Sequence, residues 1–286
     1  MLLAAPWILG FLIFRAGPMM ASIFLSLTAW DLLTPWKFVG LQNYRTLLFN
    51  DESVRTALRV TTLYSVVAVP LHILLGLFVA ILLNQKIKFQ SVIRTIYYLP
   101  SVVSGVAVAL LWRWIFSPDF GLLNAMLANV GIRGPAWLSN EYTVLPSFVL
   151  MSLWSIGGGM IIYLAGLQGI PTDLYEAAEV DGAGTLTKFL NVTVPMISPV
   201  IFFNLIIGII QALQEFVRAY IMTNGGPHDA SLFYMLYLYR NAFEFFKMGY
   251  ASALAWVLFA YIMLLTLIVF RFSAAWVYYE GTVKGK

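Results

Sequence analysis

Hydrophobic residues in this chain gather in six long runs, and shorter polar stretches separate them. Each run approaches or exceeds the roughly 20 residues that a helix needs to cross a lipid bilayer. A membrane-spanning strand would be about half as long and would alternate polar with apolar residues. The pattern therefore predicts six transmembrane helices, at residues 3–27, 60–83, 97–116, 142–167, 199–222 and 250–270.

The composition also indicates a polytopic membrane protein. Of the 286 residues, 61% are hydrophobic and 10% are charged, whereas soluble domains are typically about 45–50% apolar and about 25% charged. The chain has no cysteine, which excludes disulfide bonds and thiolate metal sites. Its net charge of +4 is small and spread between the predicted spans, so we expect no nucleic acid as a partner.

Residues 172–198 form a long polar segment in which acidic residues cluster. The acids lie within nine residues of one another, at Asp173, Glu176, Glu179 and Asp181. Acids in a first helical turn suit the positive end of a helix dipole. Thr172 or Asp173 can cap this helix, and Glu176 has the spacing of a capping-box partner. Gly182 is expected to end the helix, because glycine adopts the left-handed conformation at little cost.

A second short amphipathic helix is predicted after Gly182. It places Leu186, Phe189 and Leu190 on one side, and Pro195 and Pro199 mark the beginning of the next apolar run. The segment is therefore predicted to be a helix, a glycine bend and a second helix, all outside the bilayer.

This segment resembles the EAA loop of the permease subunits of ATP-binding-cassette (ABC) importers. That loop reads EAA, two residues, DGA, five residues, F and a later proline. The matching residues are Glu176, Ala177, Ala178, Asp181, Gly182, Ala183, Phe189, Pro195 and Pro199. The resemblance implies an all-α fold of six transmembrane helices, the type I importer permease fold, with a cytoplasmic coupling helix. It also implies that a partner ATPase docks on Glu176, Ala177, Ala178, Asp181, Gly182, Ala183 and Pro195.

Three further motifs resemble the sugar-type subfamily of these permeases, to which the maltose and glycerol-phosphate permeases belong. They are GLQNY at residues 40–44, the Phe120, Gly121 and Asn124 of FGLLN, and TNGGP at residues 223–227. The resemblance covers nearly the whole chain and is sharpest from the third to the sixth span. Relatives usually carry a basic tail before the first span, so the natural start could lie upstream of Met1.

The family resemblance implies a complex in the inner membrane of a bacterial or archaeal cell. Its expected partners are a second, homologous permease, two copies of an ATPase, an external solute-binding protein and the lipid bilayer. ATP and magnesium would be used by the ATPase, and no cofactor is expected on this chain. The chain would be a transport subunit and not an enzyme. ATP-driven closure of the ATPase would rock the spans and expose a central cavity outward, which is alternating access.

Orientation rests on one loop and on the resemblance. The stretch NQKIK after the second span favours a cytoplasmic loop there, although the overall distribution of Lys and Arg does not decide the matter. We therefore predict cytoplasmic termini. The expected units are an N-terminal helix with its external loop at 1–55, a transmembrane core at 56–276 and a short cytoplasmic tail at 277–286.

Polar residues inside the spans are the candidates for a solute path. Aromatic planes and amides suit sugar rings, so Trp154, Tyr163, Asn204 and Gln211 could serve, although each could equally be a packing residue. His72 is read as a hydrogen-bonded packing residue, with a proton relay as the alternative. No metal site is expected, because His72 and His228 lie on different predicted elements.

Two charged features and one glycine cluster remain open. Arg15 falls within the first span and must reach a partner or water, unless the span is shifted. Glu215 and Arg218 could form an intrahelical pair or face a polar cavity. The glycines at residues 157–159 would let helices pack closely or bend.

The rival interpretation is a stand-alone, ion-coupled secondary carrier. Such a carrier needs titratable or sodium-binding groups near the middle of the membrane, and His72 and Arg15 are the residues that could provide them. An intramembrane enzyme is disfavoured because no paired catalytic residues occupy facing spans. The sequence has no GxxxxGK[ST] string, so the chain is not expected to hydrolyse nucleotide through a P-loop.

Overall fold

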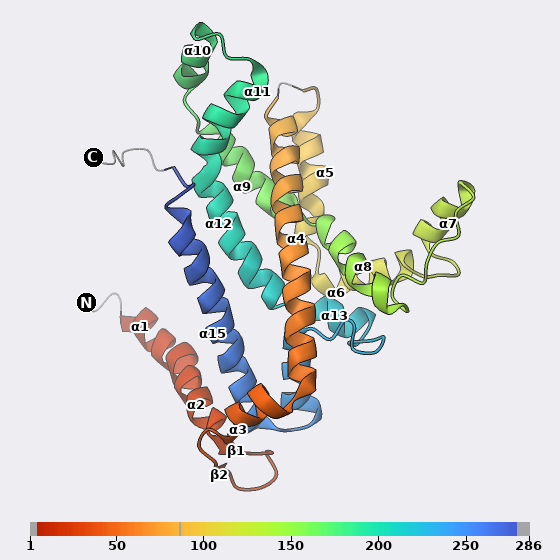
Figure 1. Cartoon of the computed structure of the whole chain (residues 1–286), viewed down its shortest axis with the longest axis vertical. Coiled ribbons are helices and arrows are strands. Elements are labelled where there is room, and N and C mark those ends of the chain that lie inside the picture. Colours follow the sequence, from red (N-terminus) through yellow and green to blue (C-terminus); the bar gives the residue numbers. More distant parts are fainter. Residues whose placement is uncertain (1–4, 86, 279–286) are drawn as a thin grey trace.

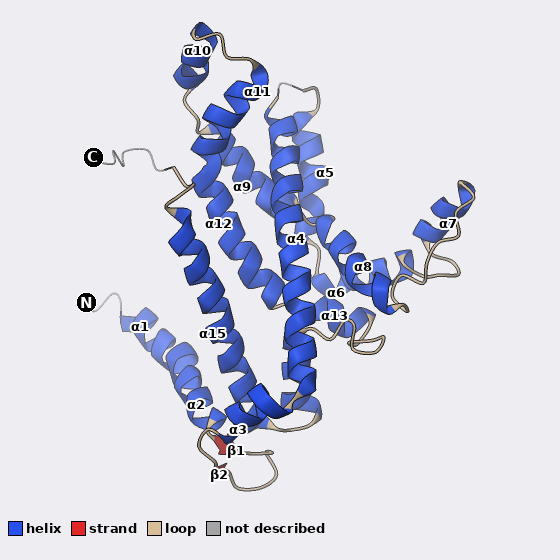
Figure 2. Cartoon of the chain, viewed as in Figure 1, coloured by secondary structure: helices blue, strands red, loops and turns tan. Residues whose placement is uncertain are grey.

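The structure is a computed structural model that describes residues 5–85 and 87–278. Figure 1 shows a bundle of long helices with short helices at both of its ends. Figure 2 shows that helix dominates the described residues and that their only strands form one small hairpin. Parts of three sequence predictions lie outside the described residues, namely residues 3 and 4 of the first span, Lys86, and residues 279–286 of the tail.

Four stretches are long and apolar enough to cross a membrane. They are Ala5–Ser26, Glu52–Asn84, Thr185–Met222 and Met248–Ser273. Two bent pairs bring the number of candidate spans to six if each pair is one span. The first pair is α5 (Gln90–Val102) with α6 (Gly105–Ile115), and the second is α8 (Glu141–Leu153) with α9 (Gly157–Gln168). Judged by length and composition, the number of candidate spans therefore agrees with the six that were predicted.

Three of the six predicted spans are bent or interrupted in the structure. The run at 97–116 is not one helix, because Val103 and Ser104 are extended and α5 and α6 meet at 99°. The run at 142–167 is bent by 47° just before Gly157. The run at 199–222 is interrupted at residues 214–216, where Phe216 leaves helical geometry. The hydropathy of an apolar run predicts that the run lies in the lipid. It does not predict the local backbone angles on which these breaks depend.

Helix α4 (Glu52–Asn84) is the central helix of the bundle, and it packs against α8, α9, α12 (Val194–Leu213) and α14 (Tyr234–Tyr239). It begins eight residues before the predicted span, because Asp51 caps it by accepting hydrogen bonds from the backbone N–H groups of Ser53 and Val54 at 3.0 and 3.3 Å. On one half, Tyr64 and Phe148 pack on either side of Phe233, with ring centroids 5.1 and 5.4 Å away. The other half packs around Met160 in a second buried cluster.

The remaining elements cap the bundle at two opposite ends (Figure 1). One end, called here the hairpin end, contains antiparallel strands β1 and β2 with Thr28 opposite Phe38. Its elements are β1 (Thr28–Ala29), β2 (Lys37–Phe38), α3 (Gln42–Arg45), η3 (Thr46–Asn50), α13 (Val217–Met222), α14 (Tyr234–Tyr239) and η5 (Arg240–Glu244), while α7 (Leu122–Asn129) projects to one side.

The opposite end, called here the loop end, carries the predicted EAA segment. Its elements are α10 (Thr172–Val180), α11 (Thr185–Lys188), the π-helical turn η4 (Phe189–Thr193) and the start of α12 (Val194–Leu213). The last described residue also lies here, since the N–H of Tyr278 donates to Ser198 Oγ at 2.8 Å.

The first and last spans pair at one side of the bundle. The first span consists of α1 (Ala5–Phe11), the π-helical turn η2 (Leu12–Ala16) and α2 (Gly17–Ser26). It packs on α15 (Met248–Ser273), and Trp256 Nε1 donates to Ser22 Oγ at 3.1 Å. Arg15 lies in η2 and is exposed at the surface of this chain.

Candidate functional site

A cavity of about 480 Å³ lies beside α4, where α9, α12 and α13 approach it. Its wall follows helical periodicity on two elements. Tyr64, Ala68 and His72 recur every four residues along α4, and Asn204, Gly208 and Gln211 share a face of α12. The volume lies within the usual range for small-molecule sites, about 300–1,000 Å³.

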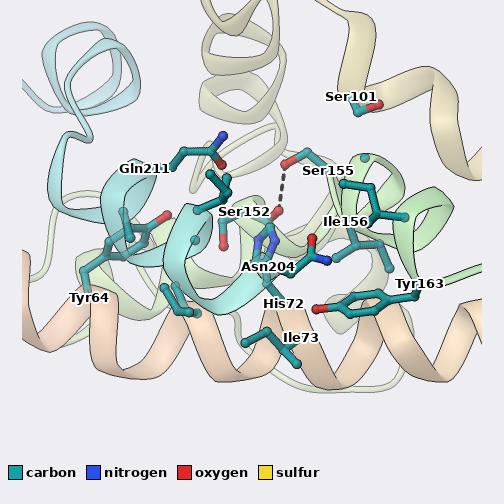
Figure 3. Close-up of a pocket in the computed structure, with 18 of the residues that line it drawn as sticks. Tyr64, His72, Ile73, Ser101, Ser152, Ser155, Ile156, Tyr163, Asn204 and Gln211 are labelled. Carbon is teal, nitrogen blue, oxygen red and sulfur yellow. Dashed lines mark hydrogen bonds between the residues drawn. The ribbon is translucent and has the colours of Figure 1, made fainter. Parts of the chain in front are cut away.

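Several polar groups line the cavity, and the described structure leaves one of them, the buried Tyr163 hydroxyl, without a hydrogen-bond partner. Figure 3 shows it directed to the side where His72 and Asn204 lie. Asn204 Nδ2 donates to the carbonyl of Val200 at 2.9 Å, whereas its Oδ1 would lie 3.4 Å from a Cβ placed on Gly159. The Ser155 hydroxyl donates to the carbonyl of Ser152 at 2.9 Å (Figure 3).

The glycines at residues 157–159 both open the cavity and allow the bend. A Cβ on Gly157 would overlap the backbone of Tyr97 and Tyr98, so this position requires glycine for the close approach of α5 and α9. Gly158 and Gly159 line the cavity. The two functions suggested for these glycines from the sequence, packing and bending, therefore occur together.

Glu215 and Arg218 close the break between α12 and α13. The backbone N–H of Arg218 donates to Glu215 Oε1 at 3.3 Å, and the guanidinium forms an ion pair with Oε2. Glu215 thus caps the new helix with its carboxylate. Arg218 also lines the cavity, whereas Glu215 does not. The two side chains form a pair, but not within one helix, because Glu215 lies in the break before α13, and only Arg218 of the two lines the cavity.

Three of the four residues predicted for the solute path line the cavity, namely Tyr163, Asn204 and Gln211. Trp154 does not line it and instead lies at the bend between α8 and α9, with its ring centroid 6.1 Å from that of Trp112. Sequence reasoning missed Tyr64, Ser101, Ser152 and Ser155 and gave His72 a packing role. The eight-residue spacing of Tyr64 and His72 could have placed both on one stripe of α4.

The EAA segment folds as two helices joined at Gly182. Gly182 has φ +75°, its N–H donates to the carbonyl of Glu179 at 3.0 Å, and the N–H of Ala183 donates to that of Ala178 at 2.9 Å. This pair of hydrogen bonds is the Schellman motif that ends many helices. The predicted capping box is wrong, because Pro171 occupies the N-cap of α10 and no side chain caps it. A proline at this position already restricts the backbone, so the helix starts without Thr172 or Asp173 as its cap.

Apolar side chains of the EAA segment are exposed on this chain. Val180, Leu186 and Leu190 are 89%, 69% and 53% exposed. Of the predicted docking residues, Glu176, Ala177, Asp181 and Gly182 are exposed, and Ala178, Ala183 and Pro195 are half-buried. The helix that starts at Thr185 continues through η4 into α12. The second short helix of the segment is therefore continuous with the next span, and Pro195 lies near the start of α12 without ending the helix.

Two side-chain contacts fix α10 to the following helix. Lys188 Nζ lies 2.5 Å from Glu179 Oε1, and this hydrogen bond and charge lower the pKa of the Glu179 carboxyl. The hydroxyls of Tyr175 and Thr193 are 2.9 Å apart. The segment is therefore a defined helical pair that projects from the bundle.

Comparison with known proteins identifies the chain. The family described as "Binding-protein-dependent transport system inner membrane component" matches residues 72–278. The chain belongs to this family. It is thus a multi-pass inner-membrane permease component of a transport system, and the predicted role of a transport subunit rather than an enzyme is confirmed. A stand-alone carrier does not fit a family defined by dependence on a binding protein.

Relatives and solved structures extend the family match over nearly all of the permease. The probable ABC transporter permease protein YesP of Bacillus subtilis is 45% identical over 281 residues, 97% of this chain and 91% of the relative. The arabinooligosaccharides transport system permease protein AraP of the same organism is 34% identical, over 96% and 88% of the two chains. A chain of a bacterial ABC transporter involved in the import of the acidic polysaccharide alginate has a TM-score of 0.83 and 26% identity, over 96% and 95%. The predicted ABC importer permease fold is confirmed.

The sugar-type motifs of the permease hold its loops in place. Asn43 of GLQNY donates through Nδ2 to the carbonyls of Ser26 and Thr28, both at 2.8 Å. Asn124 of FGLLN accepts a hydrogen bond from Trp137 Nε1 at 2.7 Å. Gly225 of TNGGP has φ +83°. None of these motif residues lines the described cavity, so in this chain their contacts stabilise loops outside it.

Proposed function

We propose that this permease forms part of the path for a carbohydrate that an external binding protein delivers. A separate ATPase would dock on α10 and α11 and drive the transport cycle. The observation that carries the proposal is the EAA segment, which presents exposed apolar residues on a defined helical pair outside the bundle. A second, homologous permease would complete the path.

Exposed side chains support docking on the EAA segment. A surface with Val180 and Leu186 open to water is costly unless another protein covers it. Gly182 holds the turn between α10 and α11 in a conformation that suits glycine. The docked face would include the predicted residues Glu176, Ala177, Ala178, Asp181, Gly182, Ala183 and Pro195.

The chemistry of the cavity and the names of the relatives support a carbohydrate. Relatives are named as permeases for arabinooligosaccharides and for trehalose and maltose, and one similar structure contains an alginate pentasaccharide on its periplasmic protein. In this chain, Tyr163, Asn204 and Gln211 offer a ring face, hydroxyl and amide groups. Such groups bind the faces and hydroxyls of sugars.

The proposed orientation places the loop end and both termini in the cytoplasm. Tyr278 lies beside Ser198 at the loop end, and residues 85 and 185 flank the same end. The chain has no native cysteine, so single cysteines can report orientation. Gln85→Cys and Thr185→Cys should react from inside and Asn224→Cys from outside. Reaction of Thr185→Cys from outside would overturn the docking proposal.

Gly182 provides the sharpest test of docking, and Gly184 provides the matched control. Gly182→Val should strain the turn by roughly 1 kcal/mol or more, since valine disfavours a positive φ. Gly184 has φ −70°, and a Cβ at this position would have no other atom within 4 Å, so Gly184→Val should be tolerated. We expect Gly182→Val to weaken retention of the ATPase and ATP-dependent uptake in reconstituted vesicles, with no loss of the folded permease.

The same vesicles separate the proposal from its rival. Uptake should require the ATPase, ATP and the binding protein. Uptake that persists without the ATPase and follows an ion gradient would identify a secondary carrier instead. Equal ATPase retention by both valine variants would mean that the EAA segment is only a connection between spans.

A further inference from the structure

We propose that the cavity selects a carbohydrate that carries a carboxylate or another acidic group, and that Arg218 binds this group. The inference rests on the proposed function, because it assumes that the cavity belongs to the path of a carbohydrate. It adds two points to that function, namely that the solute is acidic and that Arg218 binds its acidic group.

The ion pair of Arg218 and Glu215 is asymmetric toward the cavity. Arg218 lines the cavity and its side chain is 24% exposed, whereas the Glu215 side chain is 6% exposed and lies outside the lining. The carboxylate accepts a hydrogen bond from the backbone N–H of Arg218 and forms the ion pair from outside the cavity lining. A solute in the cavity therefore meets the cation first.

The guanidinium has binding capacity beyond Glu215. Arginine carries five N–H donors in a planar fork that suits carboxylates, sulfonates and phosphates. The ion pair uses one terminal nitrogen of Arg218 for Glu215. The remaining donors can form charge-assisted hydrogen bonds, which are stronger than those between neutral groups.

No acidic side chain among the described lining residues opposes this charge. Arg218 is the single permanently charged residue in the described lining, and the other polar members are hydroxyl, amide and imidazole groups. A cation that faces a partly apolar space attracts an anion more strongly than it would in water. The neutral polar groups, including Tyr163 and Gln211, remain available for sugar hydroxyls.

A structural role alone accounts poorly for this charge. Buried ion pairs contribute little net stability, because desolvation offsets their attraction. The cap at the break needs an acceptor for the N–H of Arg218, which a neutral glutamine at position 215 could also supply. Charged residues inside membrane spans are energetically costly, and most of them have a functional role.

The test compares the binding of an acidic sugar with the binding of its neutral methyl ester. Binding of disaccharides of mannuronate, galacturonate and glucuronate to the purified transporter is measured by calorimetry, beside binding of their methyl esters, which keep the skeleton and lose the charge. We expect at least one acid to bind about tenfold or more tightly than its ester, as expected for charge-assisted hydrogen bonds. Equal affinity of each acid and its ester would overturn the inference.

Variants then assign the preference to Arg218. Glu215→Gln combined with Arg218→Gln leaves no unpaired buried charge and should abolish the preference for the acid over its ester. Arg218→Lys should restore part of the preference. Arg113→Gln is the control, because it removes an arginine of α6 that does not line the cavity. Thermal unfolding would show whether the double variant folds. If it folds and still prefers the acid, Glu215 and Arg218 only stabilise the helix break and do not select the solute.

Failure of this inference can be told from failure of the proposed function. ATP-dependent uptake of neutral sugars without preference for acids would overturn the inference alone. ATP-dependent uptake of a solute that is not a carbohydrate, with no sugar bound, would overturn both.

Discussion

The hairpin end and the loop end differ in where their contacts come from. At the hairpin end, residues far apart in sequence bind one another directly, as when the hydroxyls of Tyr237 and Tyr250 donate to Asp51 Oδ2 at 2.6 and 2.5 Å. At the loop end, α10 is mostly exposed, its polar side-chain contacts are to the helix that follows it, and Tyr175 also packs on the bundle core. The hairpin end is held together within this chain, whereas the loop end leaves most of α10 exposed, as the proposed docking of an ATPase requires.

Asp51 shows how the hairpin end gains its stability. One carboxylate caps α4 through Oδ1 and accepts from tyrosines of α14 and α15 through Oδ2. Burial and the hydrogen bond to Asp51 raise the pKa of Tyr237 to about 12, so this tyrosine stays a donor at any physiological pH. Three elements are thereby joined at one charged group.

The largest effect is expected from Gly249→Ala at the hairpin end. A Cβ at this position would overlap the carbonyl of Thr28, which is backbone and cannot rotate away. We expect a loss of roughly 3 kcal/mol, as for severe overpacking, measured as a lower Tm of the purified protein. Gly10→Ala is the control, since nothing lies within 4 Å of its added carbon. Equal Tm values for the two variants would remove the claim that the hairpin end is tightly self-packed.

A smaller effect is expected from Asp51→Ala. It removes a helix cap and the acceptor of two tyrosines, which together should cost about 2 kcal/mol. Asp181→Ala at the exposed end of α10 should leave the Tm of the isolated permease nearly unchanged. If both substitutions lowered the Tm alike, the contrast between the two ends would fail.

The smallest effect concerns Glu179 and Lys188. The pKa of Glu179 is lowered, so the contact contributes above the ordinary glutamate pKa of 4.5 and is lost as the pH falls through the lowered value. A spin label on Gly184→Cys should keep its mobility from pH 8 to pH 5 and gain mobility at lower pH. With Glu179→Gln, the label should be mobile throughout, whereas Glu176→Gln should behave like the parent chain. A pH-independent label in the parent chain would show that this contact does not hold the turn.

The six spans could be predicted because each depends on an average over some 20 residues. The end of α10 at Gly182 was also predictable, because a positive φ strongly favours glycine. The start of α4 was missed, although Asp51 before Glu52 is a recognisable helix cap, because hydropathy gives weight only to the apolar part of a helix.

The cavity was only partly accessible from sequence. Polar residues within a span, such as Asn204 and Gln211, can be selected without a structure, but the face to which they point depends on packing. The break at Ser104 precedes Gly105, and the break at Phe216 follows the polar residues Gln214 and Glu215, but such residues inside an apolar run do not give the angle between the helices. Because Arg218 reaches the cavity only through the second of these breaks, its position could not be derived from spacing alone.

The unbroken helix from Thr185 into α12 has a mechanical consequence. From Leu186 to Gln211 it spans 25 residue steps, or roughly 38 Å at 1.5 Å per residue. Along such a lever arm, a tilt of about 5° displaces the far end by about 3 Å, which is the length of a hydrogen bond. A tilt small enough to leave an ATPase contact at Leu186 intact would therefore move Gln211 far enough to make or break a hydrogen bond to a hydroxyl group of the solute.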